Sequence, residues 1–212
     1  MYQCRATLAK MTDAILLPAA GASSRMRGRD KLLEDVDGCP LLRLQAKRAL
    51  AACPLVFVAL PPPPHPRYLA LDGLDLLALA VPEHVEGLGG TLRGAVGQLP
   101  PGIDRLLLLL PDLADISDSD IREVLAAADA YPDALVWRAA TPDGQPGHPV
   151  VFDKSLLPAF AGLSGDTGGS PVIGRAGDRV FLHRLAGGQA LQDLDTPEQW
   201  AEWRSRKKST SD

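Results

Sequence analysis

The chain has 212 residues, of which 46% are hydrophobic and 23% are charged, and its formal net charge is −4. This length suits one domain with a substantial core, and the composition is typical of a globular protein, which argues against general disorder and against a membrane protein. The mild acidity argues against a broad nucleic-acid surface, because proteins that bind a duplex usually present a basic face.

Residues 1–12 are expected to form a loose leader before the first strand, as chain termini often do. They do not predict a signal peptide, because the apolar run after Asp13 is short and ends in a glycine loop without a cleavage site. The three cysteines, Cys4, Cys39 and Cys53, are an odd number without a C-x-x-C pair, so neither a disulfide framework nor a thiolate zinc site is expected. A reducing, cytoplasmic location fits this cysteine usage.

The apolar run that begins at Ile15 predicts a buried strand, and a loop of small residues follows it. Residues 19–22 have little or no side chain, so a ligand can approach their backbone N–H groups closely. Ser23 and Ser24 add hydroxyl donors. Four cations follow within seven residues, opposed only by Asp30: Arg25, Arg27, Arg29 and Lys31. On an acidic chain this local excess predicts a polyphosphate ligand, the alternative being an ordinary solvated loop.

The remaining elements alternate between the two kinds of secondary structure. Strands are predicted at residues 56–60, 74–81, 106–110, 135–139, 150–152 and 180–185. Helices are predicted from Pro40, over residues 91–99, from Ser117 to about Ala130, over residues 155–160 and from Pro197 onward. The alternation implies βαβ units with right-handed crossovers, and therefore a three-layer α/β fold with a mostly parallel sheet. Ligands of such sheets bind at the carboxyl ends of the strands.

The glycine loop that follows the first predicted strand matches neither the Walker A pattern nor the dinucleotide fingerprint G-x-G-x-x-G. Instead, the P-A-A-G-A-S-S-R-M of residues 18–26, the K-L-L of residues 31–33 and the G-x-P-L-L of residues 38–42 resemble the signature of the MobA-like nucleotidyltransferases. Within that family the chain is most similar to the MocA-type molybdenum cofactor cytidylyltransferases. The resemblance covers nearly the whole chain.

Later motifs follow in the order of that family. They are G-x-x-x-T at residues 87–91, L-P-D-L at 110–113, G-H-P at 147–149, G-D-x-G at 165–168 and D-T-P at 195–197. Two features depart from its pattern. Pro111 and Ala114 alter the flanks of Asp112, and Ser170 stands where many MocA-type members carry an arginine. The second departure concerns the acceptor more than the nucleotide.

The resemblance implies a Rossmann-like αβα fold of the nucleotide-diphospho-sugar-transferase type. It also implies Mg²⁺-dependent transfer of CMP from CTP to a phosphorylated acceptor, the molybdenum cofactor (molybdopterin), with release of pyrophosphate. CTP is favoured over GTP because Ala20 stands where the guanylyltransferase branch typically has glycine. A molybdoenzyme chaperone would be a natural recipient of the product, and neither nucleic acid nor a membrane is expected as a partner.

The alternatives are a guanylyltransferase, a sugar-phosphate or alcohol-phosphate nucleotidyltransferase of the same superfamily, and a non-catalytic nucleotide-binding module. We expect one nucleotidyltransferase domain over residues 1–206, with a nucleotide-binding half at about 13–140 and an acceptor-side half at about 141–206. Residues 207–212 are expected to be a disordered tail.

Nucleotidyl transfer to a phosphate requires no general base, because the acceptor is already an anionic nucleophile. It requires charge neutralisation and in-line positioning at the α-phosphorus. We therefore assign Arg25 to the β- and γ-phosphates and Lys31 to the α-phosphate. The residues expected to bind the nucleotide are Ala19, Ala20, Gly21, Ser23, Ser24, Arg25, Lys31, Gly87 and Thr91.

Asp112 is the first candidate Mg²⁺ ligand, because this ion prefers carboxylate and phosphate oxygens; the alternative is a turn residue before the next helix. Asp166 is the second candidate, the alternative being a loop residue bonded to its own backbone. The resemblance also places Gly147, His148 and Asp166 in the acceptor pocket, although His148 could equally be a structural hydrogen-bonding residue. Asp195 is expected to be structural, beside a helix cap.

Overall fold

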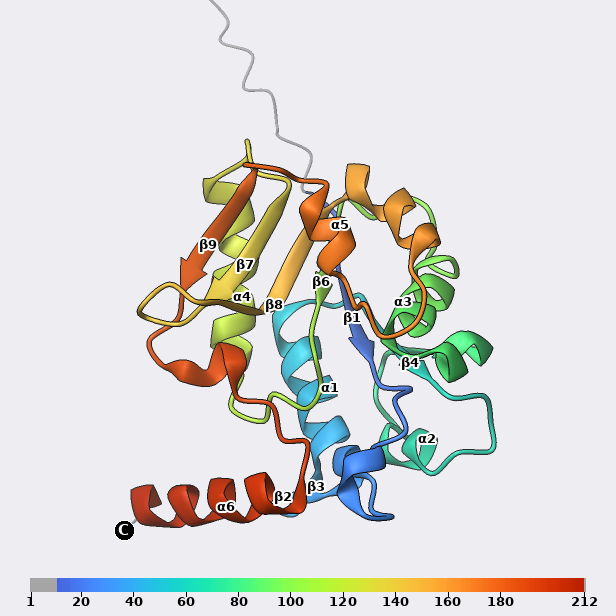
Figure 1. Cartoon of the computed structure of the whole chain (residues 1–212), viewed down its shortest axis with the longest axis vertical. Helices are drawn as coiled ribbons and strands as arrows, with labels where there is room; N and C mark the ends of the chain where they lie inside the picture. The colour runs from blue at the N-terminus through green and yellow to red at the C-terminus, as the bar shows by residue number, and fades with distance from the viewer. Residues whose placement is uncertain (1–10, 212) are drawn as a thin grey trace, which may run out of the picture.

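Seven strands form one mixed sheet at the centre of the computed structural model, which describes residues 11–211 (Figure 1). The strands are β1 (Asp13–Pro18), β4 (Val56–Leu60), β5 (Leu77–Ala80), β6 (Arg105–Leu108), β7 (Val136–Ala140), β8 (Pro146–Asp153) and β9 (Val180–Arg184). They lie in the order β5-β4-β1-β6-β8-β7-β9, and β8 runs antiparallel to both of its neighbours, β6 and β7. The other pairs are parallel. A separate two-stranded hairpin joins β2 (Asp35–Val36) to β3 (Cys39–Pro40).

Helices cover both faces of the sheet, so the predicted three-layer α/β fold with a mostly parallel sheet is confirmed. The α-helices are α1 (Leu41–Ala52), α2 (Arg67–Ala70), α3 (Leu88–Val96), α4 (Asp118–Ala130), α5 (Ser170–Gly174) and α6 (Pro197–Ser211). The 3-10 helices are η1 (Ser24–Met26), η2 (Lys31–Leu33), η3 (Pro82–Glu86), η4 (Lys154–Gly162) and η5 (Gly188–Leu191).

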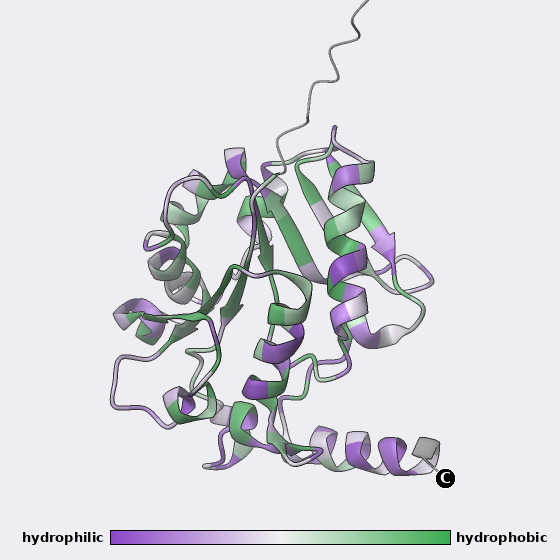
Figure 2. Ribbon diagram, turned by 180° about the vertical axis from the view of Figure 1, so that it is seen from behind, coloured by the Kyte–Doolittle hydropathy of each residue, from purple (hydrophilic) through white to green (hydrophobic). Residues whose placement is uncertain are grey.

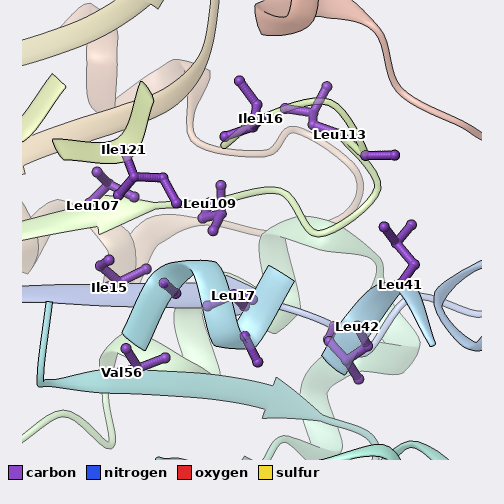
Figure 3. Packing of buried hydrophobic residues seen from close by; sticks show 14 of the residues in the cluster. Ile15, Leu17, Leu41, Leu42, Val56, Leu107, Leu109, Leu113, Ile116 and Ile121 are labelled. Carbon is purple, nitrogen blue, oxygen red and sulfur yellow. The ribbon is translucent and has the colours of Figure 1, made fainter. Parts of the chain in front are cut away.

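Alternating side chains of the central strands point to opposite layers, as the period of a strand requires. Ile15 and Leu17 of β1 pack with α1 and α4 in one buried cluster, part of which Figure 3 shows. Leu16 lies on the other face, in a second cluster with residues of α3 and η4. The central strands are therefore buried on both sides and are the most hydrophobic part of the chain (Figure 2). Burial of this kind contributes roughly 25 cal/mol per Å² of apolar surface.

Two helix starts follow the signals in the sequence. The Ser117 side chain accepts the N–H of Asp120, whose carboxylate accepts the N–H of Ser117, and this capping box starts α4. At α6, Thr196 and Gln199 exchange equivalent bonds of 2.9 and 3.2 Å. Both helices were expected from these residues, and α4 ends at Ala130 as predicted.

α3 is displaced from its predicted position at residues 91–99, and β8 is longer than predicted. α3 begins at Leu88 and not at Thr91, because Gly87 turns the chain with a φ of 102°. Gly89 and Gly90 weaken the helix signal in the sequence, but they stand where the neighbouring backbone leaves no room for a side chain. β8 runs over eight residues, Pro146–Asp153, where only residues 150–152 were predicted.

The expectation of a disordered tail is corrected where the structure describes it: α6 continues to Ser211. Lys207 lies 5.3 Å from the centre of the Trp203 ring and 3.7 Å from Asp115, which adds stabilising contacts to this part of the helix. The predicted leader up to residue 10, with Cys4, and residue 212 lie outside the described residues. Within residues 11–211 no helix is both long and apolar enough to cross a membrane.

Candidate active site

A cleft of about 940 Å³ lies at the carboxyl ends of β1 and β6, where ligands of such sheets bind. One wall is the glycine loop, residues 19–30, together with η2, and the opposite wall is formed by η3 and the start of α3. The floor includes residues 110–112, and two aspartates before α6, Asp193 and Asp195, complete the lining. In Figure 1 the start of α6 lies beside the lower end of the glycine loop, and Arg27 and Glu198 join them with an ion pair of 2.6 Å.

Cations and carboxylates from distant parts of the chain meet in this cleft. The Nζ atom of Lys31 lies 2.5 Å from Oδ2 of Asp112 and 2.6 Å from Oδ1 of Asp195. Arg25 binds the other oxygen of Asp195 at 2.6 Å, while its side chain stays 68% exposed. Burial disfavours the charged form of Lys31, but Asp112 and Asp195 outweigh burial and raise the pKa of Lys31. Lys31 is therefore a fixed positive charge at neutral pH.

Asp112 has one carboxylate oxygen that lacks a hydrogen-bond partner in the described part of the chain. It follows β6 at the floor of the cleft, and its Oδ2 binds Lys31. Its Oδ1 is buried and has no hydrogen-bond partner anywhere in residues 11–211. A buried carboxylate oxygen without a partner is costly, and a divalent cation is the kind of ligand that removes the cost. The residues present therefore fit a Mg²⁺-like ion beside Asp112.

Asp195 was expected to be structural, and it does sit beside the helix cap, since its N–H donates to Gln199. Its carboxylate, however, faces Lys31 and Arg25 in the cleft. Asp193 lies next to it: burial, then a hydrogen bond and the charge of Asp195, raise the pKa of Asp193. The pKa of Asp195 is lowered, because Lys31, Asp193 and Arg25 outweigh the effect of burial.

A sequence signal for this pair existed and was missed. In an extended segment, residues two apart point to the same side, so the D-L-D of residues 193–195 places both carboxylates on one face while Leu194 is buried. The D-T-P-E-Q of residues 195–199 is a helix-capping pattern, which accounts for Asp195 without indicating that its carboxylate also contacts Lys31.

Asp166 lies at the opposite wall. Its Oδ1 accepts the N–H of Leu88, 3.3 Å away, at the start of α3. The fit there is close: a Cβ added to Gly87 would lie 2.1 Å from this oxygen. Asp166 thus satisfies one of the unpaired N–H groups that begin every helix. Thr91 is buried in the first turn of α3, where its hydroxyl donates to the carbonyl of Gly87 at 3.1 Å.

A model of the MobA-like NTP transferase domain matches residues 14–180 of this chain. The chain belongs to this family. No match is found among curated protein sequences. Three solved structures that resemble the MobA-like domain are all less than 25% identical to it, so they bear on its fold alone.

The first is the Rv0371c protein of Mycobacterium tuberculosis H37Rv in complex with manganese, with 21% identity, a TM-score of 0.69, and coverage of 92% of this chain and 97% of that one. The second is a nucleotidyl transferase from a Methanothermobacter species, with 20% identity, a TM-score of 0.74 and coverage of 95% and 100%. The third is CMP:2-keto-3-deoxy-manno-octonic acid synthetase complexed with CTP, with 18% identity, a TM-score of 0.69 and coverage of 94% and 99%. These three agree on the nucleotide-diphospho-sugar-transferase type of fold.

Most of the predicted nucleotide-binding residues of the MobA-like domain line the cleft. These are Gly21, Ser24, Arg25, Lys31, Gly87 and Thr91, joined by Asp112 and Asp166 of the predicted metal set. Ala20 and Ser23 line a second cavity of about 500 Å³ on the other side of the glycine loop, and Ala19 is buried. Within residues 11–211 no group of three or more His, Cys, Asp or Glu side chains has the arrangement of a metal site.

The predicted acceptor residues Gly147 and His148 are not in the lining of the cleft. Gly147 packs against the backbone of η5, where an added Cβ would lie 2.2 Å from the Ala190 carbonyl oxygen. His148 is largely buried, and its Nδ1 has no hydrogen-bond partner in the described part of the chain. Burial, assisted by the charge of Arg138, lowers the pKa of His148 to about 4 in spite of the opposing charge of Asp112. The ring is therefore neutral at neutral pH.

This depressed pKa makes the stability of the MobA-like domain sensitive to acid. Between pH 6.5, the ordinary pKa, and about pH 4, the unfolded state binds a proton at His148 that the folded state does not. The free energy of unfolding therefore falls as the pH is lowered through this window. His148→Gln is expected to make that fall shallower, measured by urea unfolding at several pH values. His183→Gln, which removes a histidine on β9 that pairs with Glu123, is the control. Equal pH slopes for His148→Gln and the unmodified protein would contradict the assignment.

Proposed function

We propose that this MobA-like domain transfers CMP from CTP to a phosphorylated acceptor, the molybdenum cofactor (molybdopterin), in a Mg²⁺-dependent reaction that releases pyrophosphate. The observation that carries the proposal is the cluster of Lys31, Asp112 and Asp195 in the cleft, with one buried Asp112 oxygen left without a partner in residues 11–211. In this proposal the cation that binds phosphate, Lys31, and the carboxylate that binds the metal, Asp112, are joined directly by an ion pair.

Each residue has a role in this proposal. Lys31 binds the α-phosphate and stabilises the charge that develops there, and the exposed Arg25 binds the β- and γ-phosphates. Asp112 and Asp195 would hold the divalent ion, which neutralises phosphate charge when it is bound. Two carboxylates suffice, because Mg²⁺ takes its remaining ligands from phosphate oxygens and water. Asp166 remains a candidate for the acceptor side of the cleft, opposite Lys31.

Support for the ion and the nucleotide comes from the structural neighbours. One of them was solved in complex with manganese and another in complex with CTP, and both have the same fold as this chain. Ala20 lines the second cavity, and it favours cytidine by the resemblance already stated. Ser170 begins α5 on the exposed surface and is not in the cleft lining, so a sugar-phosphate or other alcohol-phosphate acceptor is the second candidate. If molybdopterin is the acceptor, a molybdoenzyme chaperone would receive the product.

A nucleotide panel tests the proposal. We expect CTP with Mg²⁺ to raise the melting temperature more than GTP, ATP or UTP does, because a ligand that binds only the native state stabilises it by mass action. Pyrophosphate release is expected from CTP only when molybdopterin is added. A larger shift with GTP would overturn the base assignment. Release with a sugar phosphate but not with molybdopterin would replace the acceptor. No release with any phosphorylated acceptor would leave a nucleotide-binding module.

A further inference from the structure

One arginine that the sequence did not single out makes contacts with both ends of the glycine loop. Arg67 begins α2, and its side chain is 2% exposed. Its Nη1 donates to the carbonyl oxygen of Ala19, the first residue after β1, at 2.7 Å. Its Nε and Nη2 donate to the two oxygens of Asp30, each at 2.8 Å. Nη2 also donates to the hydroxyl of Ser23 at 3.1 Å. One guanidinium therefore binds the start, the middle and the end of the loop.

The partners of Arg67 are bonded to the residue that carries the proposed chemistry. The hydroxyl of Ser23 accepts the N–H of Lys31 at 3.2 Å, and Asp30 accepts the N–H of Leu32 at 3.0 Å and so caps η2. Burial would raise the pKa of Asp30, but the hydrogen bonds and the charge of Arg67, together with hydrogen bonds from Leu32 and Ser23, lower this pKa. The buried arginine thus faces an ionised carboxylate, and this bidentate pair fixes the backbone from which the Lys31 side chain extends into the cleft.

The glycine loop needs an external support of this kind. Ser23 and Arg27 have φ angles of 52° and 53°, in the left-handed region that side-chain-bearing residues rarely adopt. Such backbone persists only where the surroundings hold it. Pro66 directly precedes Arg67 and ends the proline-rich connection after β4, which makes the base of α2 stiff. Arg67 therefore ties a strained loop to a rigid segment more than 35 residues away along the chain.

We propose that Arg67 is a positioning residue for nucleotidyl transfer: through Ala19, Ser23 and Asp30 it fixes the glycine loop so that Lys31 and the loop N–H groups face the nucleotide. The inference rests on the proposed function, and it goes beyond the phosphate-binding residues to the side chain that holds them in place. A guanidinium is required, because three different nitrogens of Arg67 bind the two Asp30 oxygens and the Ala19 carbonyl, and the single nitrogen of an ammonium group cannot occupy all three positions.

Arg67→Met is the direct test, and Arg105→Met is the matched control. Arg105 is also buried and also binds a carboxylate through two nitrogens, with 2.6 and 3.1 Å to Asp13, but it lies at the start of β6, away from the cleft. We expect both variants to lose thermal stability. Only Arg67→Met should raise KM for the nucleotide and lower kcat, with a loss of about 100-fold in kcat/KM, the size expected when a catalytic group is displaced by about 1 Å. Arg67→Lys is expected to resemble Arg67→Met.

Amide hydrogen exchange of the glycine loop gives a readout that does not depend on turnover. Faster exchange in residues 19–30 is expected for Arg67→Met and not for Arg105→Met. If Arg67→Met does not fold, Asp30→Asn replaces it, because it keeps the arginine and weakens the same pair. Unchanged loop exchange together with unchanged KM and kcat in these variants would overturn the positioning role. Failure of the unmodified protein to release pyrophosphate from any nucleotide would instead overturn the proposed function, while leaving the exchange result to decide whether Arg67 holds the loop.

Discussion

Asp112→Asn is expected to lower metal-dependent turnover by about 100- to 1,000-fold, the loss that follows removal of one group aimed at transition-state charge. Asparagine has the size of aspartate but no charge, so the buried oxygen that has no partner in residues 11–211 is no longer a ligand for a divalent cation. The fold should tolerate the change, because Lys31 keeps Asp195 at 2.6 Å. Initial rates of pyrophosphate release across a Mg²⁺ or Mn²⁺ series measure the effect.

Asp115→Asn is the matched control for this prediction. Asp115 lies three residues further along the same connection, but its carboxylate accepts the indole N–H of Trp203 at 2.9 Å and does not line the cleft. We expect its variant to turn over like the unmodified protein. Full metal-dependent activity in Asp112→Asn would mean that the ion binds elsewhere in the cleft.

Lys31→Met is expected to have two effects of opposite sign. Turnover should fall by at least about 100-fold, because a positive charge next to the α-phosphate is lost. The affinity of the nucleotide-free protein for Mn²⁺ should rise, because Nζ of Lys31 binds one oxygen of Asp112 and one of Asp195, the two carboxylates proposed to hold the ion. The raised pKa of Lys31 keeps it protonated as a competitor at neutral pH. Titration calorimetry with Mn²⁺, beside the rate measurement, separates the two effects.

Lys47→Met controls for the loss of one positive charge, because Lys47 is exposed on α1 and away from the cleft. It should change neither the Mn²⁺ affinity nor the rate. If Lys31→Met bound Mn²⁺ no more tightly than Lys47→Met, the lysine and the ion would not share these carboxylates, and the metal site would have to be sought around other residues.

The parts of the site that could be predicted are those whose signals are local. The small residues and cations after β1 are contiguous, and Asp112 follows a leucine run that ends at the same edge of the sheet. Ser117 and its capping partner lie three residues apart and predicted the start of α4. In each case the residues that decide the structure are neighbours in the sequence, so pattern alone predicts it.

The parts that could not be predicted depend on contacts across long stretches of chain. Arg67 lies 37 residues from Asp30 and 48 from Ala19, and Lys31 lies 164 residues from Asp195. No local pattern indicates such a pairing. The direction of β8 was missed for the same reason, since its antiparallel pairing with β6 and β7 depends on the order of strands in the sheet and not on its own residues.

The bond between Lys31 and Asp195 also bears on when the site first exists. A chain leaves the ribosome from its N-terminus, and early segments begin to fold before later ones are made. Lys31, Asp112 and Asp195 are therefore synthesised in that order, and the last member follows the first by 164 residues. A partly made chain has the glycine loop and the floor of the cleft but lacks the carboxylate that completes the charge balance. Because every strand of the sheet precedes Asp195 in the chain, the cleft can reach its final charge only after the whole sheet has been made, so shorter nascent chains lack the complete site.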